Sequence, residues 1–412
     1  MGRTLSEWFW NPDVWLPPNI TWADIKSNET VKYAEFEDLY HPIPMAFLFL
    51  VIRFFVERFI WAPVGRSMGL KAMRPKRVAY NELLEDAYRK SRRVSHKQVR
   101  QLAKELDWTE RQVDRWLRLR KLQDSPNKLT RFTETGWQFT YYLFIFCYGL
   151  HTLWDKAWFW EIRHCFYNMP FHPMDNDVWW YYMLSLSFYW SMTLRHFFDV
   201  KHKDFWEMLL HHLVTISLLS FSWACNFTRI GTLTLIVHDI SDIFLLGAKM
   251  FKYLQLQMLC DVTFAVFVLI WIVTRLGIYP GWILYSTYLF DEPPTCALLP
   301  TGLPILSAPE RTTIDATYIV EFFPAYYIFN SMLIGLLVLH CIWTYYILLM
   351  AYQALSAGQI QGDSRSDSSE EVSSSSEENA LPNSTPATNG VSKPAAAGDG
   401  GAATAVAAGG DN

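Results

Sequence analysis

Two neighbouring apolar stretches of the chain contain the runs His211-His212-Leu213-Val214-Thr215, within residues 207–225, and Val237-His238-Asp239-Ile240-Ser241-Asp242, within residues 228–250. Each stretch is long enough to cross the hydrocarbon core of a bilayer as a helix. A carboxylate at the centre of such a helix costs about 2.5–3.5 kcal/mol on insertion scales. Ionisable side chains placed there commonly face a polar cavity and act in it, so the two runs form the candidate reaction centre.

The rest of the chain also contains apolar stretches of membrane-spanning length. Of its 412 residues, 51% are hydrophobic and 17% are aromatic, whereas the mean hydropathy is only slightly positive. The apolar residues must therefore be clustered. We predict an all-α polytopic membrane protein with about seven transmembrane helices. The predicted spans are residues 44–61, 137–154, 178–198, 206–225, 228–250, 260–279 and 325–352.

The charges of the loops predict the orientation of these spans. Lys and Arg residues follow the first, third and fifth spans, and the positive-inside rule places those loops in the cytosol. The N-terminus is then lumenal and the C-terminus cytosolic. The first twenty residues lack a basic start followed by an apolar core, so we expect no cleavable signal peptide. Sequons make Asn19 and Asn28 the predicted glycosylation sites, while Asn226 lies too close to the membrane.

Composition divides the chain into five predicted segments. They are a lumenal segment (1–43), the first transmembrane helix (44–61), a basic cytosolic insert (71–131), the main transmembrane domain (132–353) and an acidic, Ser-rich cytosolic tail (354–412). The tail has almost no large apolar residues, so we expect it to be disordered. Acidic residues three positions after certain serines suit an acid-directed kinase, with an unmodified tail as the alternative. The predicted phosphorylation sites are Ser364, Ser368, Ser374 and Ser375.

The basic insert contains 18 Lys and Arg residues against eight Asp and Glu. Three helices are predicted within it, at residues 80–92, 95–106 and 109–123, with Ser95 as an N-cap. This pattern resembles a homeodomain. Leu119, however, stands where homeodomains carry the Asn that contacts adenine, and Leu cannot hydrogen-bond a base edge. We therefore favour binding to anionic headgroups over the alternative of DNA binding, and do not expect nucleic acid as a partner.

The two motif-bearing helices are antiparallel on the predicted topology and bring two kinds of ionisable side chain to one depth. A His oriented by a carboxylate can act as a general base or a nucleophile. Neighbouring helical residues point about 100° apart, so we expect one His of the pair to react and the other to hold the reacting groups in position. The alternative is that these groups only pack helices together through Ser and Thr neighbours. The candidate catalytic residues are His211, His212, His238, Asp239 and Asp242.

Metal chemistry is the rival interpretation of the same residues. Membrane di-iron enzymes need about eight histidines in paired boxes, and of the 11 here only His211-His212 form such a pair. The six cysteines contain no CxxC pair, so neither a zinc site nor a disulfide framework is indicated. We expect no metal and no cofactor.

The two runs resemble the signature of the ceramide synthases, the TLC-domain N-acyltransferases of the endoplasmic reticulum. Asn226 lies between them as in that signature, and the resemblance extends from Trp15 to about Asp367. It includes Trp15-Leu16-Pro17-Pro18, the degenerate homeodomain, Asp204-Phe205-Trp206 and Phe322-Phe323-Pro324-Ala325-Tyr326-Tyr327-Ile328-Phe329-Asn330-Ser331.

The resemblance implies transfer of a fatty acyl group from acyl-CoA to the amine of sphinganine or sphingosine, giving dihydroceramide or ceramide. It implies that the last six spans form a barrel around a long cavity that CoA enters from the cytosol. The five candidate residues map onto the family's catalytic positions, with direct transfer and an acyl-imidazole intermediate both open. Homo- or heterodimers occur in that family, and membrane lipids surround it. The expected substrate-binding residues are Lys201, Lys203, Lys249, Lys252 and Asn226, although loop lysines equally serve topology.

Two other functions compete with this interpretation. A TLC-domain protein could carry or sense lipids without catalysis. A membrane-tethered regulator could instead act through the basic insert. Substitution of His211 or Asp242 would leave either of these functions intact, whereas it would abolish catalysis.

Overall fold

The computed structural model describes residues 5–71, 77–91, 94–124, 127–198, 205–288 and 323–357. Within these ranges every regular element is helical. Several predictions lie outside the described residues: the substrate-binding residues Lys201 and Lys203, and the tail from residue 358 onward, with Ser364, Ser368, Ser374 and Ser375.

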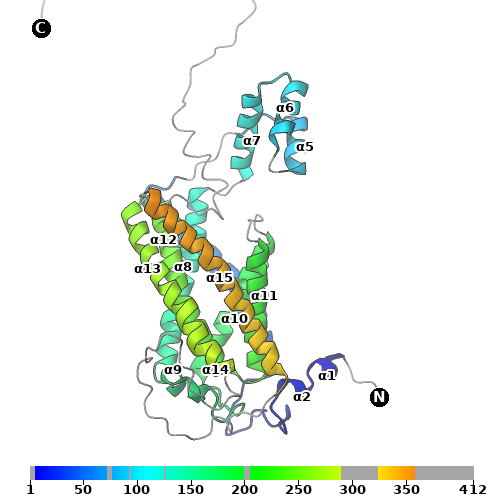
Figure 1. Cartoon of the computed structure of the whole chain (residues 1–412), viewed down its shortest axis with the longest axis vertical. Helices are drawn as coiled ribbons and strands as arrows, with labels where there is room; N and C mark the ends of the chain where they lie inside the picture. Colours follow the sequence, from blue (N-terminus) through cyan, green and yellow to red (C-terminus); the bar gives the residue numbers. More distant parts are fainter. Residues whose placement is uncertain are drawn as a thin grey trace, which may run out of the picture.

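Seven long helical stretches occur in the described part of the chain, and each overlaps one predicted span (Figure 1). Two of them are compound, because a π-helical segment continues the α-helix. They are α3–η2–α4 (Pro42–Phe55, Val56–Trp61, Ala62–Ser67), α8 (Lys128–Leu153), α10 (Asn176–Phe198), α11 (Phe205–Ala224), α12 (Thr228–Tyr253), α13–η4–α14 (Gln257–Trp271, Ile272–Leu284, Tyr285–Tyr288) and α15 (Ala325–Ala357). The last continues past residue 353, where the predicted domain ended.

Three of these stretches are long and apolar enough to cross a membrane by length and composition: Thr228–Tyr253, Gln257–Thr287 and Ala325–Ser356. They correspond to the fifth, sixth and seventh predicted spans, so the all-helical, multi-pass class is confirmed. The short elements of the described residues are α1 (Leu5–Phe9), α2 (Pro12–Trp15), η1 (Phe36–Tyr40), α9 (Ala157–Trp160) and η3 (Ile162–Cys165).

Aromatic side chains and small residues pack α8, α10 and α12 closely together. The rings of Tyr141 on α8 and Phe188 on α10 stack with centroids 3.5 Å apart. Gly149 permits the same close approach, because a Cβ there would lie 2.6 Å from the Tyr181 ring. The resulting core also includes Trp223 of α11 and Leu336 of α15. These packed helices enclose the space in which the candidate residues lie.

The basic insert folds into three helices, α5 (Glu82–Lys90), α6 (His96–Glu105) and α7 (Glu110–Asp124). Ser95 caps α6, and its hydroxyl accepts a hydrogen bond from the Gln98 backbone N–H, as predicted. Val113 and Trp116 are buried in the core of this unit. Hydrogen bonds from the Arg120 side chain hold the pKa of Glu85 below its ordinary value and join α7 to α5.

The N-terminal segment packs against the far end of the helical bundle from α5–α7 (Figure 1). The Trp15 ring lies 4.8 Å from that of Phe221 on α11. Trp15 also shares a buried cluster with Phe227 and Phe323. Its indole N–H donates to the Phe9 carbonyl at 2.7 Å. The first helices therefore cover the ends of α11 and α15 on this side.

Candidate active site

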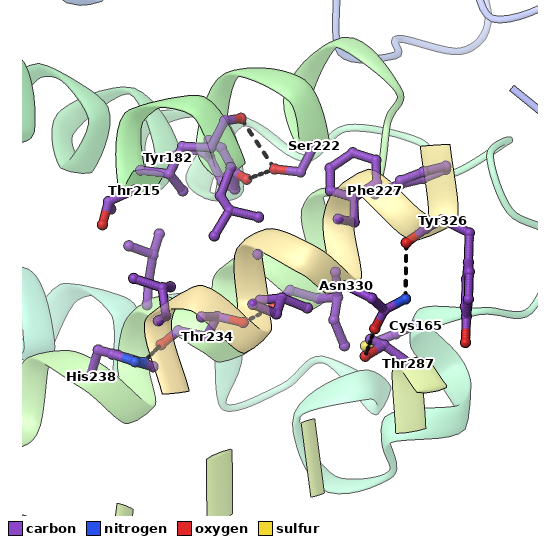
Figure 2. A pocket seen from close by; sticks show the side chains of 18 of the residues that line it. Cys165, Tyr182, Thr215, Ser222, Phe227, Thr234, His238, Thr287, Tyr326 and Asn330 are labelled. Atoms are coloured by element: carbon purple, nitrogen blue, oxygen red, sulfur yellow. Dashed lines mark hydrogen bonds between the residues drawn. The ribbon is translucent and has the colours of Figure 1, made fainter. Parts of the chain in front are cut away.

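A cavity of about 360 Å³ lies between α10, α11, α12 and α15. Figure 2 shows His238 and Thr234 at one end, and Asn330, Thr287 and Cys165 at the other. Between the two ends the wall is largely apolar. The wall residues used below include Tyr182, Tyr189, His211, Ser222, Gly231, Leu333 and Leu336. The shape suits a long apolar ligand with its reactive group near the two histidines.

His211 and His238 come from different helices, α11 and α12, and both line this cavity. Within the described residues, neither ring nitrogen of His211 hydrogen-bonds a partner, and its Nδ1 is buried. The His211 ring contacts Trp343 of α15 edge-on, with centroids 5.2 Å apart. The two helices thus each place one imidazole on the wall of the same cavity.

The hydrogen bonding of His238 assigns its tautomer. Nδ1 lies 2.6 Å from the Thr234 carbonyl oxygen, one turn earlier on α12 (Figure 2). A carbonyl only accepts, so Nδ1 carries the proton and Nε2 presents its lone pair. Nε2 is buried and has no hydrogen-bond partner among the described residues. An unpaired buried acceptor on a cavity wall is suited to take a proton from a ligand.

Arg275 and His340 complete this polar cluster, and sequence reasoning missed both. The Arg275 guanidinium is buried and donates to the His238 carbonyl at 2.8 Å and to the Ser241 hydroxyl at 2.9 Å. The His340 ring lies 5.0 Å from the His238 ring. Arg275 lies in the π-helical segment η4, and such segments often occur at functional sites.

The two carboxylates of the signature lie behind the cavity wall rather than on it. Asp239 is buried and accepts a hydrogen bond from the Tyr181 hydroxyl at 3.5 Å. Asp242 lies 3.7 Å from the Arg275 guanidinium. Among the described residues no hydrogen bond or ion pair joins either carboxylate to a histidine. The expected His–Asp242 pairing is thus replaced by an Arg275–Asp242 pair, because helix rotation turns Asp242 toward η4.

His212 points away from the cavity and packs between α10 and α11. Its ring lies 5.8 Å from that of His196 and 6.4 Å from that of Tyr189. It is 4% exposed. The two adjacent imidazoles therefore differ in place, with one on the cavity wall and the other inside the helix packing. His211 is the member that can meet a ligand.

Asn226 differs from its expected role in substrate binding. Its side chain is fully buried, and its amide N–H groups donate to the carbonyls of Pro170 and His172, at 2.5 and 2.9 Å. Asn226 is not on the cavity wall. It instead holds the α11–α12 turn against the loop before α10, which contains Pro170 and His172. Burial lowers the pKa of His172 in that loop to about 4. The short Asn side chain also tolerates its positive φ of 56°.

Lys249 and Lys252 lie in the last two turns of α12, at the end of the bundle nearest α5–α7 (Figure 1). Both side chains are half-buried. Along α12 they lie beyond Asp242 and away from the cavity, so they do not contact the cavity wall.

The cavity end away from the histidines is closed by polar and aromatic side chains. The Thr287 hydroxyl lies 3.0 Å from Asn330 Oδ1, and the Asn330 amide donates to the Tyr326 carbonyl at 3.0 Å. Tyr182 and Ser222 share a hydrogen bond on the opposite wall (Figure 2). Among the described residues, no group of three or more His, Cys, Asp and Glu side chains could hold a metal ion.

Comparisons with known proteins agree with this architecture. Residues 131–349 match the family model of the TLC domain. The chain is 38% identical over 373 residues to ceramide synthase 5 of Homo sapiens, covering 90% of this chain and 88% of that protein. It is 39% identical over 368 residues to human ceramide synthase 3, covering 89% of each. It is 32% identical over 362 residues to ceramide synthase hyl-1 of Caenorhabditis elegans, covering 88% of this chain and 84% of that protein.

Proposed function

The chain belongs to the ceramide synthases and is a sphingoid base N-acyltransferase, and from that premise we propose that acyl transfer takes place at His211 and His238. The observation that carries the proposal is that these two imidazoles line one apolar cavity, His238 with an unpaired Nε2. The substrates are a fatty acyl-CoA and a sphingoid base. Sphinganine N-acylation by purified protein, compared between wild type and a His211 variant, tests the assignment.

The reaction requires an acyl acceptor and a base, and the cavity wall provides one imidazole for each role. His211 attacks the thioester carbonyl carbon, the carbon–sulfur bond breaks, and CoA leaves as a thiolate that takes up the N–H proton lost by the acylated imidazole. His238 Nε2 then takes a proton from the ammonium of the sphingoid base. The free amine attacks the acyl-imidazole, the carbon–nitrogen bond to His211 breaks as the amide bond forms, and the departing imidazole takes up the proton that the amine nitrogen loses. Direct attack on the thioester, with His211 as base, is the alternative and forms no acylated protein.

The apolar wall protects such an intermediate. An acyl-imidazole hydrolyses readily in water, and a cavity lined by Leu333, Leu336 and Phe329 excludes water from the acyl chain. Arg275 supports the site from behind, because its two hydrogen bonds fix the backbone of His238 and the side chain of Ser241. We assign Arg275, Asp242, Asp239 and His212 positioning roles, since none of the four lines the cavity.

We further propose that all seven long helical stretches cross the endoplasmic reticulum membrane, with the N-terminus in the lumen, the last six stretches around the cavity and the homeodomain-like unit in the cytosol. Loop charges support this orientation. Figure 1 supports it too, since α5–α7 lie beyond the end of the bundle at which α15 ends, and α1–α2 lie at the opposite end. Lys249 and Lys252 are then cytosolic, where CoA phosphates approach. Homo- or heterodimerisation stays a prediction from the family.

Glycan mapping tests the lumenal assignment. Asn19 and Asn28 are exposed, whereas Asn226 is fully buried. Glycosidase treatment of the protein from microsomes is expected to remove glycans from two sites. Asn19→Gln and Asn28→Gln should each abolish one step of the mobility shift, and Asn226→Gln should abolish none. An unglycosylated wild type, or a glycan lost in Asn226→Gln, would contradict the assignment.

Filling the cavity should shorten the preferred acyl chain. Leu333 is 7% exposed and lines the wall, whereas the next residue, Ile334, is 44% exposed and faces outward. Overfilling a packed apolar site costs about 1–3 kcal/mol, which corresponds to roughly 5- to 150-fold in rate. Leu333→Phe is therefore expected to lower the ratio of kcat/KM for long over short acyl-CoA by about tenfold. Ile334→Phe, the matched control, should leave the ratio unchanged; equal effects of both variants would contradict the assignment of the wall.

A further inference from the structure

One face of α7 carries three arginines that project away from the core of its unit. Arg111, Arg115 and Arg118 are all exposed. They are spaced four and three residues apart, so they fall within about 60° of one another around the helix. The buried Val113 and Trp116 lie on the opposite side. The three arginines are hereafter called the arginine face.

Two other arginines of this unit are ion-paired, whereas no ion pair is formed by the arginine face within the described residues. Arg100 pairs with Glu110 at 3.1 Å, and Arg120 pairs with Glu85 at 2.8 Å and with Asp124 at 2.5 Å. Within the described residues, no ion pair or hydrogen bond involves the side chains of the arginine face. Like charges at this spacing repel one another, so an anion on this face would stabilise the helix.

We propose that the acidic segment 363–378 of the C-terminal tail, phosphorylated on serine, binds the arginine face. The segment contains six acidic residues and only one basic residue, Arg365. Each phosphoserine adds about 1.5–2 further negative charges and three acceptor oxygens. The planar guanidinium fork of Arg binds phosphate in a bidentate manner, which Lys cannot. The partner is therefore matched in charge and in hydrogen-bonding geometry.

The connection between the two parts of the chain is short. Helix α15 ends at Ala357, and Figure 1 places that end at the same end of the bundle beyond which α7 lies. The acidic segment begins six residues later. An extended chain from Ala357 reaches about 20 Å at residue 363 and about 70 Å at residue 378. Tethering at this length gives an effective concentration of roughly millimolar, so weak charge-assisted contacts suffice. The inference rests on the cytosolic placement proposed above and does not require catalysis.

Photo-crosslinking in the full-length protein tests the proposal. A benzoylphenylalanine at position 372 lies between the predicted phosphorylation sites. The protein is reconstituted in nanodiscs of phosphatidylcholine, phosphorylated with an acid-directed kinase and irradiated. Crosslinked peptides are expected to map to α7. The triple variant Arg111→Gln/Arg115→Gln/Arg118→Gln should reduce their yield at least about fivefold, because the charge-assisted hydrogen bonds to phosphate are lost. Unphosphorylated protein should show a similarly reduced yield.

A matched control carries the same loss of charge elsewhere on the unit. Arg89, Lys97 and Lys104 are exposed residues of α5 and α6, and their triple replacement by Gln should leave the crosslink yield within about twofold. The proposal is overturned if phosphorylated wild type shows no crosslink to α7, or if the two triple variants behave alike. It is also overturned if phosphatidylserine-rich nanodiscs abolish the crosslink, since the arginine face would then belong to membrane headgroups. Sphinganine N-acylation measured in parallel distinguishes failure of this proposal from failure of the active-site assignment.

Discussion

Replacing His211 with Ala is expected to reduce sphinganine N-acylation by at least about a thousandfold, since a nucleophile or a general base contributes effects of this size. Of the two adjacent histidines, His211 is the one that lines the cavity. Within the described residues its ring makes no hydrogen bond whose loss would unfold the helix. The measurement is kcat/KM of purified protein with sphinganine and acyl-CoA. Thermal melting and size-exclusion profiles should match those of the wild type.

His212→Ala is the matched control for this prediction. The two residues are adjacent on α11, but His212 packs against His196 and Tyr189 rather than on the cavity wall. Its removal leaves a cavity in the helix packing, so it should lower stability and reduce activity by a smaller factor. If folded His211→Ala retains activity while His212→Ala loses it, the reacting residue is His212 and the proposed cavity is not the reaction site.

Replacing Arg275 with Met is expected to lower kcat by about a hundredfold and to destabilise the protein as well. Met preserves much of the volume but removes the hydrogen bonds to the His238 carbonyl and the Ser241 hydroxyl. It also leaves Asp242 without its partner at 3.7 Å. Breaking one half of a buried ion pair typically costs about 3–5 kcal/mol; Asp242 retains 24% exposure, so the lower part of that range applies. Arg275→Lys, which keeps the charge but not the two-point geometry, should lie between wild type and Met.

A double-mutant cycle separates this pair from a general loss of packing. Asp242→Asn, Arg275→Met and the double variant are compared by kcat and by unfolding free energy. If Arg275 acts through Asp242, the double variant should be no worse than Arg275→Met alone. If the losses add in both measurements, the two residues act independently and the proposed positioning pair is wrong.

Sequence reasoning predicted the helices well, because apolar length and cap residues are local signals. The helices of the basic insert and the cap at Ser95 were predicted within about two residues of their observed bounds. The seven long stretches were recognised from continuous apolar runs. The compound helix α13–η4–α14 extends nine residues beyond the predicted span 260–279, because Pro280 does not end a helix whose backbone has relaxed to π geometry.

The site was predicted less completely, because spacing along one helix does not determine its rotation against another. The placement of His211 and His238 on one wall followed from antiparallel helices, but the partner of Asp242 did not. A signal for Arg275 and His340 was nevertheless present, since each is an ionisable residue deep within an apolar span, the criterion that identified the first candidates. Asn226 was assigned to substrate because it belongs to the signature, although its role in the structure is to hold a loop.

The most direct test of the account is the mass of the protein after brief incubation with acyl-CoA and no sphingoid base, followed by rapid quenching. Wild type should carry one acyl group on the peptide containing His211, which disappears on addition of sphinganine and does not form in His211→Ala. An acyl group on another residue, or persistent activity of His211→Ala, would contradict the assignment of His211. Activity without any acylated protein would exclude the acyl-imidazole route and assign His211 as the base for direct transfer.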